Sequence, residues 1–145
     1  MQLTNPDTLH SAFTTAIEAI DTTTLDRQQV GFRHTGKGVE PTALRNFKLL
    51  ETGVEEVPGG LYSQGEQFRY TLFVVVGYRG FDEDEERFIA QDHIALRKAL
   101  MDLVGVTPGL LGVQGKGYEP DSDEGPVVRH RFSIDYIHNT GILGV

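Results

Sequence analysis

The sequence predicts a single α+β domain, with a mixed, mainly antiparallel sheet of about four strands and two helices packed on one face. Three observations predict this class. The run Phe68–Arg79 is the most β-favouring in the chain, because it is rich in aromatic and β-branched residues. Two stretches, Pro6–Ile20 and about Asp84–Val104, repeat apolar residues at helical spacing. The run Pro126–Ile137 alternates apolar and polar residues, as a strand with one solvated face does.

The size and composition of the chain limit the classes of protein it can belong to. Its 145 residues are enough for one domain with a real hydrophobic core, so we expect a single domain over residues 1–145. It has no cysteine, which excludes disulfides, thiolate catalysis and cysteine zinc sites. The formal charge of −8 argues against a nucleic-acid-binding surface, which would have a basic excess. No apolar run of 18 residues is present, and the first residues lack the basic and apolar regions of a secretory signal.

The first helix is predicted over Pro6–Ile20 by an unbroken apolar stripe. Asn5 is suited to cap it, with Pro6 at the first helical position. A short strand is predicted within Val30–Thr35, and a second, looser strand from Leu44 to about Gly53. The polar face of the helix has no lysine or arginine, so it is expected to pack on the sheet and not on a membrane.

The central strand Phe68–Arg79 is expected to be covered on both faces in its middle. Its two faces are both apolar there, which is typical of a strand inside a sheet. Before it, Glu55–Gln67 is predicted to be a long connecting loop. After it, an acidic turn leads into the second helix, and that helix is expected to fold back over the strand.

The last third of the chain is predicted to be a loop followed by a strand. Glycines and prolines are frequent in Gly105–Gly125, which favours an irregular loop. Pro126–Ile137 then forms the final strand. Its inward face is predicted to comprise Val128, His130, Phe132, Ile134 and Tyr136. Its outward face is predicted to comprise Val127, Arg129, Arg131, Ser133 and Asp135.

No motif in the sequence indicates a catalytic, cofactor or metal site. Asp82, Asp84 and Glu86 resemble the start of a calcium loop, but Arg87 stands where glycine is needed and His93 where glutamate belongs. The glycine and lysine at 115–116 lack the spacing of a phosphate loop, and no serine lies in a Gly-x-Ser-x-Gly elbow. The five histidines are scattered along the chain. We therefore predict no enzymatic activity and no cofactor.

Two features suggest contacts with other subunits. Arg129 and Arg131, on the predicted outward face of the last strand, are suited to a salt bridge, a subunit contact or an anion. The segment 139–145 is short and apolar, and Ile142, Leu143 and Val145 are too few to form a core. Such a segment is expected to dock either on a neighbouring subunit or on the edge of its own sheet.

The order of the elements resembles that of the tail terminator proteins of long-tailed bacteriophages and related viruses. The resemblance lies in the N-terminal helix Pro6–Ile20 and in the strand Arg69–Tyr78, which ends in an aspartate-rich turn. It lies also in the helix Glu85–Val104, with its run Asp92-His-Ile-Ala-Leu-Arg-Lys-Ala-Leu, and in the closing strand Val127–Ile137. The chain departs from the smaller members in its long segments Asp21–Thr42 and Gly105–Gly125.

The resemblance implies a structural virion protein in the tail or neck, assembled in the host cytoplasm. In that family six subunits form a ring that stops tail-tube polymerisation and joins the tail to the head. The implied partners are other copies of the chain, the tail tube protein and the neck or connector proteins. The resemblance also implies that DNA passes through a central channel, where an acidic lining would limit tight binding. The candidate lumen-facing acids are Glu55, Glu56, Asp82, Glu83 and Asp84.

Two other classes of protein remain open from the sequence. One is another neck or tail component, such as a connector, an adaptor or a tube-type subunit. The other is a small enzyme or ligand-binding α+β domain, for which a pocket with converging polar groups would be the distinguishing feature.

Overall fold

The fold is taken from a computed structural model that describes residues 6–22, 30–36, 39, 41, 43–56, 67–79, 85–124 and 127–139. The elements in chain order are α1 (Pro6–Glu18), β1 (Arg33–His34), β2 (Asn46–Glu56), β3 (Gln67–Arg79), α2 (Glu85–Met101), β4 (Leu110–Glu124) and β5 (Val127–Asn139). The strands form a sheet in the order β1-β2-β3-β5-β4. Only β1 and β2 pair in parallel, and the other pairs are antiparallel. The predicted α+β class, with Phe68–Arg79 in the central strand, is confirmed.

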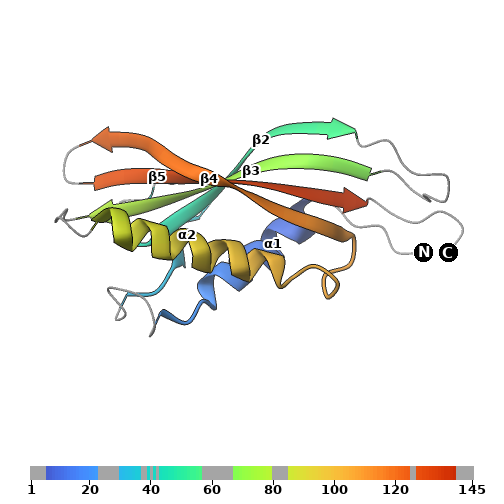
Figure 1. The fold of residues 1–145 in the computed structure, drawn as a ribbon, viewed down its shortest axis with the longest axis horizontal. Helices are drawn as coiled ribbons and strands as arrows, with labels where there is room; N and C mark the ends of the chain where they lie inside the picture. The colour runs from blue at the N-terminus through green and yellow to red at the C-terminus, as the bar shows by residue number, and fades with distance from the viewer. Residues whose placement is uncertain are drawn as a thin grey trace, which may run out of the picture.

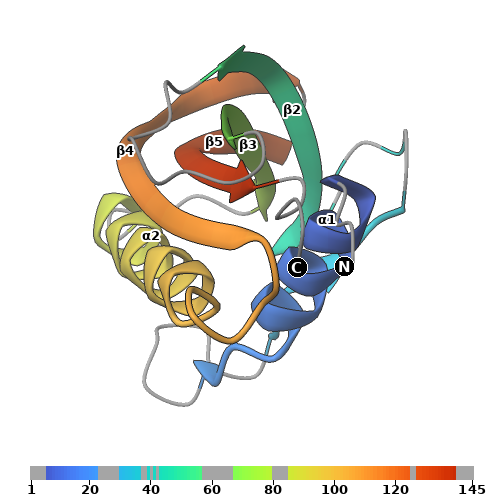
Figure 2. The ribbon, with the colours of Figure 1, turned by 90° about the vertical axis from the view of Figure 1, so that its right-hand side faces the viewer.

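The two helices lie on the same side of the sheet (Figure 1). We call the side of the sheet that they cover the helix face, and the other side the open face. Viewed along the sheet, α1 and α2 lie beside each other beneath strongly twisted strands (Figure 2). The core lies between these two layers. It includes Leu9, Phe13, Ile17, Phe47, Leu72, Val74, Val76, Tyr78, Ile89, Leu96, Leu100, Phe132, Ile134 and Tyr136.

Helix α1 follows its predicted stripe. Leu9, Phe13 and Ile17 recur at helical spacing and are at most 1% exposed. Because these residues lie on one side of the helix, the other side remains polar and solvated. Asp7 lies in the first turn, where a negative charge interacts favourably with the helix dipole.

Strand β4 is the main correction to the predicted fold. The expected loop Gly105–Gly125 is a strand of 15 residues from Leu110 onward, so the sheet has five strands and not about four. Its glycines and Pro120 hide the alternation that predicts strands. An edge strand tolerates both residue types because its outer side needs no ladder hydrogen bonds. The pairing with β5 shifts register at three points, which also obscures the period of two.

The two hairpins of the sheet are longer than the helix layer. At a rise of about 3.3 Å per residue, β4 is about 50 Å long. Helix α2, with 17 residues, is only about 26 Å long. The ends of the strands therefore project beyond the helices on one side of the domain, where β2 and β5 end and β3 begins (Figure 1).

On the open face, one end of β3 is covered by the connection before β2. A Cβ built at Gly77 would lie 2.8 Å from the carbonyl oxygen of Ala43 and 3.2 Å from Cβ of Pro41. The amide of Arg45 also donates to the carbonyl of Gly77 over 2.8 Å. The absence of a side chain at Gly77 is therefore what lets this connection approach the sheet.

We expect Gly77→Ala to lower the free energy of unfolding by about 1–3 kcal/mol, because the added methyl group meets backbone that must move. Urea unfolding followed by circular dichroism measures the change. The matched control is Gly53→Ala in β2, where a Cβ would have no neighbour within 4 Å and we expect little change. Equal stability of the two variants would contradict the close contact at Gly77.

Candidate assembly surfaces

The two arginines predicted on the outward face of β5 have different environments. Arg129 is only 8% exposed, and its Nε donates to the carbonyl of Pro41 over 2.9 Å. The expectation that Arg129 is solvent-facing was wrong, because the sequence pattern does not show the connection folding over this end of the sheet. Arg131 is half-buried, contacts the ring of Phe73 and donates to Glu119 over 2.8 Å. Arg131 is therefore the more accessible of the two for a contact between subunits.

Asp135 was also predicted to be solvated and is instead 5% exposed. Nζ of Lys116, at 2.8 Å, compensates its charge, and the Thr71 hydroxyl donates a hydrogen bond to it over 3.0 Å. These side chains, with Arg69, line a charged hollow of about 310 Å³ on the open face. The open face therefore carries charged groups that are paired with groups of opposite charge, and some of them are shielded from solvent.

Of the predicted lumen-facing acids, the structure places Glu55. Its carboxylate is exposed and accepts a hydrogen bond from Arg69 over 2.9 Å. Glu56 is the last residue of β2, and its side chain is outside the described part. Asp82, Glu83 and Asp84 lie outside the described residues, as do Ile142, Leu143 and Val145 of the apolar segment.

A buried ionic cluster that the sequence analysis missed joins α2 to the sheet. Arg45 and Asp92 are both completely buried, and their paired hydrogen bonds measure 3.0 and 2.7 Å. The Tyr78 hydroxyl donates to the same carboxylate over 2.9 Å, and Arg45 also donates to the carbonyl of Val30. The cluster fixes the connection before β2 against α2 and β3. One signal was present in the sequence, because Asp92 lies in the apolar stripe of α2, between Ile89 and Leu96.

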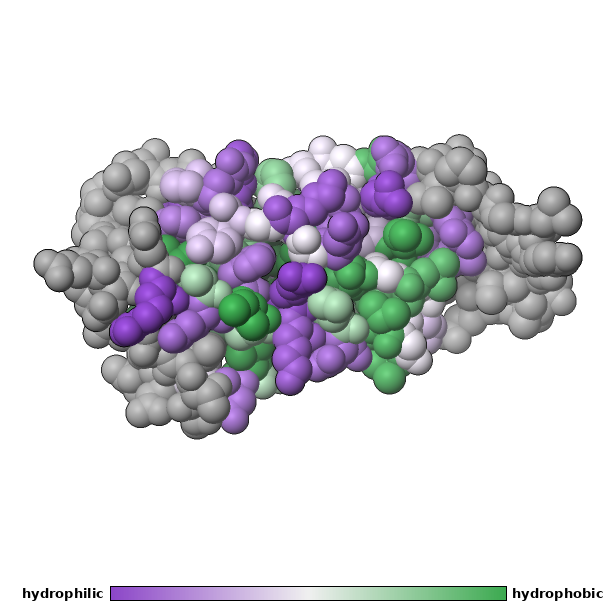
Figure 3. All heavy atoms as spheres, viewed as in Figure 1, coloured by the Kyte–Doolittle hydropathy of each residue, from purple (hydrophilic) through white to green (hydrophobic). Residues whose placement is uncertain are grey.

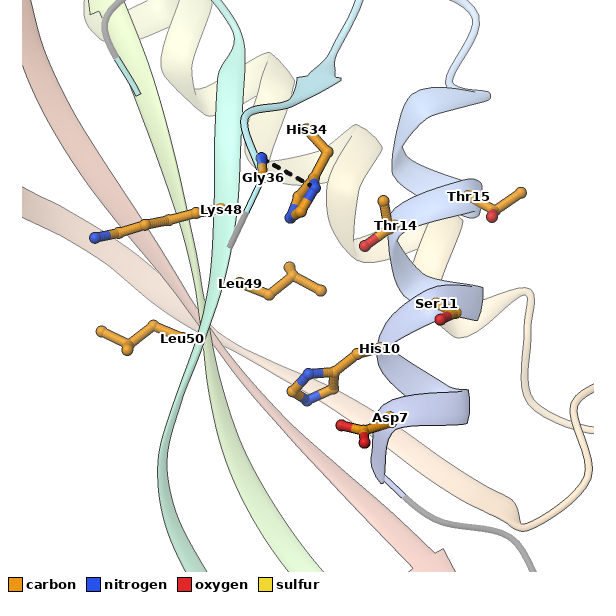
Figure 4. Close-up of a pocket in the computed structure, with 10 residues that line it drawn as sticks. All are labelled: Asp7, His10, Ser11, Thr14, Thr15, His34, Gly36, Lys48, Leu49 and Leu50. Carbon is orange, nitrogen blue, oxygen red and sulfur yellow. Dashed lines mark hydrogen bonds between the residues drawn. The ribbon is translucent and has the colours of Figure 1, made fainter. Parts of the chain in front are cut away.

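A groove of about 870 Å³ runs between α1 and the edge of β2 (Figure 4). Its wall includes His10, Ser11, His34 and Leu49, whereas the side chains of Lys48 and Leu50 point away from α1. The contact between His10 Nε2 and Glu51 measures 3.0 Å. Oε1 of Glu51 also accepts the Tyr136 hydroxyl. The polar groups at this end of the groove therefore bind one another.

The polar groups around Glu51 belong to an aromatic cluster of the core. Burial raises the pKa of Tyr136, and the hydrogen bond to Glu51 raises it further. Its hydroxyl therefore stays protonated and remains a donor. The Tyr136 ring stacks on Tyr70 and meets Phe13 edge to face. The contacts of Glu51 with His10 and Tyr136 are therefore part of the packing between α1 and the sheet.

Two half-buried histidines, His93 in α2 and His130 in β5, lie between α2 and the last two strands. The His93 ring stacks on Phe132 and contacts Tyr118, while His130 contacts Tyr78 and Tyr118. Nε2 of His93 and Nδ1 of His130 are buried without a hydrogen-bond partner within the described residues. Burial lowers the pKa of both imidazoles, and Arg97 lowers that of His93 further.

Because these pKa values lie below the ordinary value of about 6.5, the folded protein favours the neutral rings. The neutral rings stabilise the folded protein fully above about pH 6.5. This stabilisation is lost as the pH falls below that value, because the unfolded chain then binds protons that the folded protein does not. Each ring contributes a slope of up to about 1.4 kcal/mol per pH unit. We expect unfolding midpoints in urea to fall between pH 7 and pH 5. The double variant His93→Phe with His130→Phe should show a smaller fall. An equal fall of the urea midpoint with pH in this variant and in the original chain would show that His93 and His130 do not cause the pH dependence.

An apolar groove of about 610 Å³ separates the two helices on the side away from the sheet. Its lining includes Ala16, Ala19, Ile20, Ala95, Ala99 and Leu103. Ile94, also in the lining, is 67% exposed. Among the described residues, no group of three or more potential metal ligands occurs. No helix in the described part is long and apolar enough to cross a membrane.

No protein-family model matches the chain, and no curated protein matches it significantly. The function of the chain is therefore inferred from its geometry and its sequence pattern.

Proposed function

We propose that the protein is a structural virion subunit that forms a hexameric ring, terminates tail-tube polymerisation and joins the tail to the head. One observation supports this proposal most directly. The helices cover one face of the sheet only, and on one side of the domain the ends of β2, β3 and β5 project beyond them (Figure 1). A small domain with long projecting strands has extensive surface for contacts with neighbouring subunits.

The edges of the sheet add to this surface. Within the described ranges, no strand pairs with the outer edge of β4, and β1 pairs with β2 only at Asn46 and Phe47. The two edges differ in sequence, so contact of one with the other is heterologous, and repeated heterologous contacts form a ring when the rotation between subunits closes. Arg131 on the open face, together with the apolar segment after β5, is the proposed further part of the subunit interface.

The charge of the chain is compatible with a channel for DNA. Six copies at −8 each would carry a formal charge of −48. An acidic lining repels the phosphate backbone and so allows DNA to pass without tight binding. Glu55 is the exposed candidate for this lining within the described residues.

Electron microscopy of the purified chain tests the proposal. We expect closed rings with six-fold symmetry that do not stack into tubes, and we expect these rings to cap the ends of purified tail tubes. Open tubes of many rings would instead identify a tube-type subunit. A monomer at all concentrations that also leaves tube ends uncapped would overturn the proposal.

A further inference from the structure

The groove between α1 and α2 is shaped for aliphatic side chains. The alanines at 16, 95 and 99, whose side chains are short, line the hollow of about 610 Å³. Isoleucine and leucine also line it, whereas charged residues, including Asp21, Lys98 and Asp102, stand at the margin. An apolar floor with a charged margin is typical of a site that takes an apolar segment.

This groove continues into an exposed apolar surface at the end of α2. Met101, Val104, Val106 and Leu111 are between 36% and 74% exposed. Figure 3 shows hydrophobic residues gathered in this region, where α2 ends and β4 begins. Contiguous apolar surface of this kind marks an interaction site more often than scattered single residues do.

The chain itself supplies an apolar segment of matching composition. After Asn139 the sequence continues with six residues, three of which are Ile142, Leu143 and Val145. The amide of Asn139 donates to the carbonyl of Gly109 over 2.8 Å, so β5 ends beside the apolar surface. Segment 140–145 thus begins next to the apolar surface of its own subunit.

The direction of β5 disfavours docking within one subunit. The strand ends past the C-terminal end of α2 and points away from the helices (Figure 1). A return to its own groove requires a reversal, and a tight turn uses four residues. A four-residue turn that starts at residue 140 would include Ile142 and Leu143, so these side chains would not be free to serve as anchors in the groove. A neighbouring copy can instead receive the segment as it leaves the strand.

We propose that segment 140–145 of one copy docks in the groove between α1 and α2 of the next copy, with Ile142, Leu143 and Val145 as its anchors. The inference rests on the proposed ring, because it names the contact that would join adjacent subunits. It is a heterologous contact, in which each copy donates one segment and accepts another.

Cysteine cross-linking tests this contact cleanly because the natural chain has no cysteine. One preparation carries Leu143→Cys and the other carries Ile94→Cys, at the exposed margin of the groove. We expect oxidation of the mixture to give a disulfide-linked pair of unlike subunits. The control acceptor is Val54→Cys, which is 60% exposed on β2 and should give less than a tenth of that product.

Three other outcomes overturn the inference. Linkage only within a chain that carries both Leu143→Cys and Ile94→Cys would show that the segment docks on its own subunit. Equal linkage to position 94 and position 54 would show random collision. No linkage while six-fold rings form would reject this contact and leave the proposed function standing. Absence of rings and of capped tubes, scored separately by microscopy, would instead reject the proposed function.

A blocking variant provides a second readout. Ala99→Trp fills the groove, so we expect loss of the cross-link between Leu143→Cys and Ile94→Cys with a melting temperature within a few degrees of the original. Deletion of residues 141–145 should likewise reduce assembly and leave the melting temperature unchanged. Assembly that survives the deletion would contradict docking between copies.

Discussion

Replacing Asp92 with alanine is expected to lower the free energy of unfolding by about 3–5 kcal/mol, enough to unfold most of a marginally stable domain. The reason is that the change leaves the Arg45 guanidinium completely buried without its carboxylate. The Tyr78 hydroxyl loses its acceptor at the same time. Chemical unfolding monitored by circular dichroism measures the loss, and a soluble but unfolded protein is the extreme form of the same result.

Two further variants make this prediction specific to the buried pair. Asp102→Ala removes an exposed acid just after the same helix, and we expect a change within about 0.5 kcal/mol. Arg45→Ala combined with Asp92→Ala should cost less than the sum of the two single changes, because the second change removes a charge that the first left unpaired. Additive losses, or a loss below about 1 kcal/mol for Asp92→Ala, would contradict a structural role for the cluster.

The second large effect is expected for Val74→Asp in the central strand. Val74 is fully buried, and its cross-strand neighbours are Leu49 in β2 and Phe132 in β5. The substitution removes about 1.5–3 kcal/mol of side-chain burial. It also places a carboxylate among apolar side chains, which brings the expected loss above about 4 kcal/mol. We therefore expect an unfolded or aggregated product in thermal and urea unfolding experiments.

The same substitution at an exposed strand position is the control. It distinguishes the effect of burying a carboxylate from the effect of placing aspartate in a strand. Val54 in β2 is 60% exposed, so Val54→Asp should change the free energy of unfolding by less than about 1 kcal/mol. A folded Val74→Asp protein with the original melting temperature would contradict the central, covered position of β3.

Prediction of the fold succeeded where a pattern repeats over many residues. The stripe of Leu9, Phe13 and Ile17 identifies α1, because one buried side of a helix imposes that spacing. Strand β3 was equally clear, since β-branched and aromatic residues fill it. Strand β4 was missed because an edge strand with register shifts needs neither a strict period nor an absence of glycine and proline.

The candidate surfaces were less accessible to prediction, because their properties depend on distant residues. The alternation in β5 correctly places Arg129 and Asp135 on the face away from Phe132 and Ile134. Their burial, however, depends on Pro41 and Lys116, which approach from other parts of the chain. The groove between α1 and α2 likewise exists only because two helices distant in sequence lie side by side.

By itself, the sequence determined the α+β class, the two helix stripes and the central strand, because local periodicity records which side of each element is buried. Only the tertiary structure decided the fifth strand, the Arg45–Asp92–Tyr78 cluster and the groove between the helices. Each of these requires groups far apart along the chain to meet. The pairing of Arg45 with Asp92 spans 47 positions, and no local pattern specifies a partner at that separation.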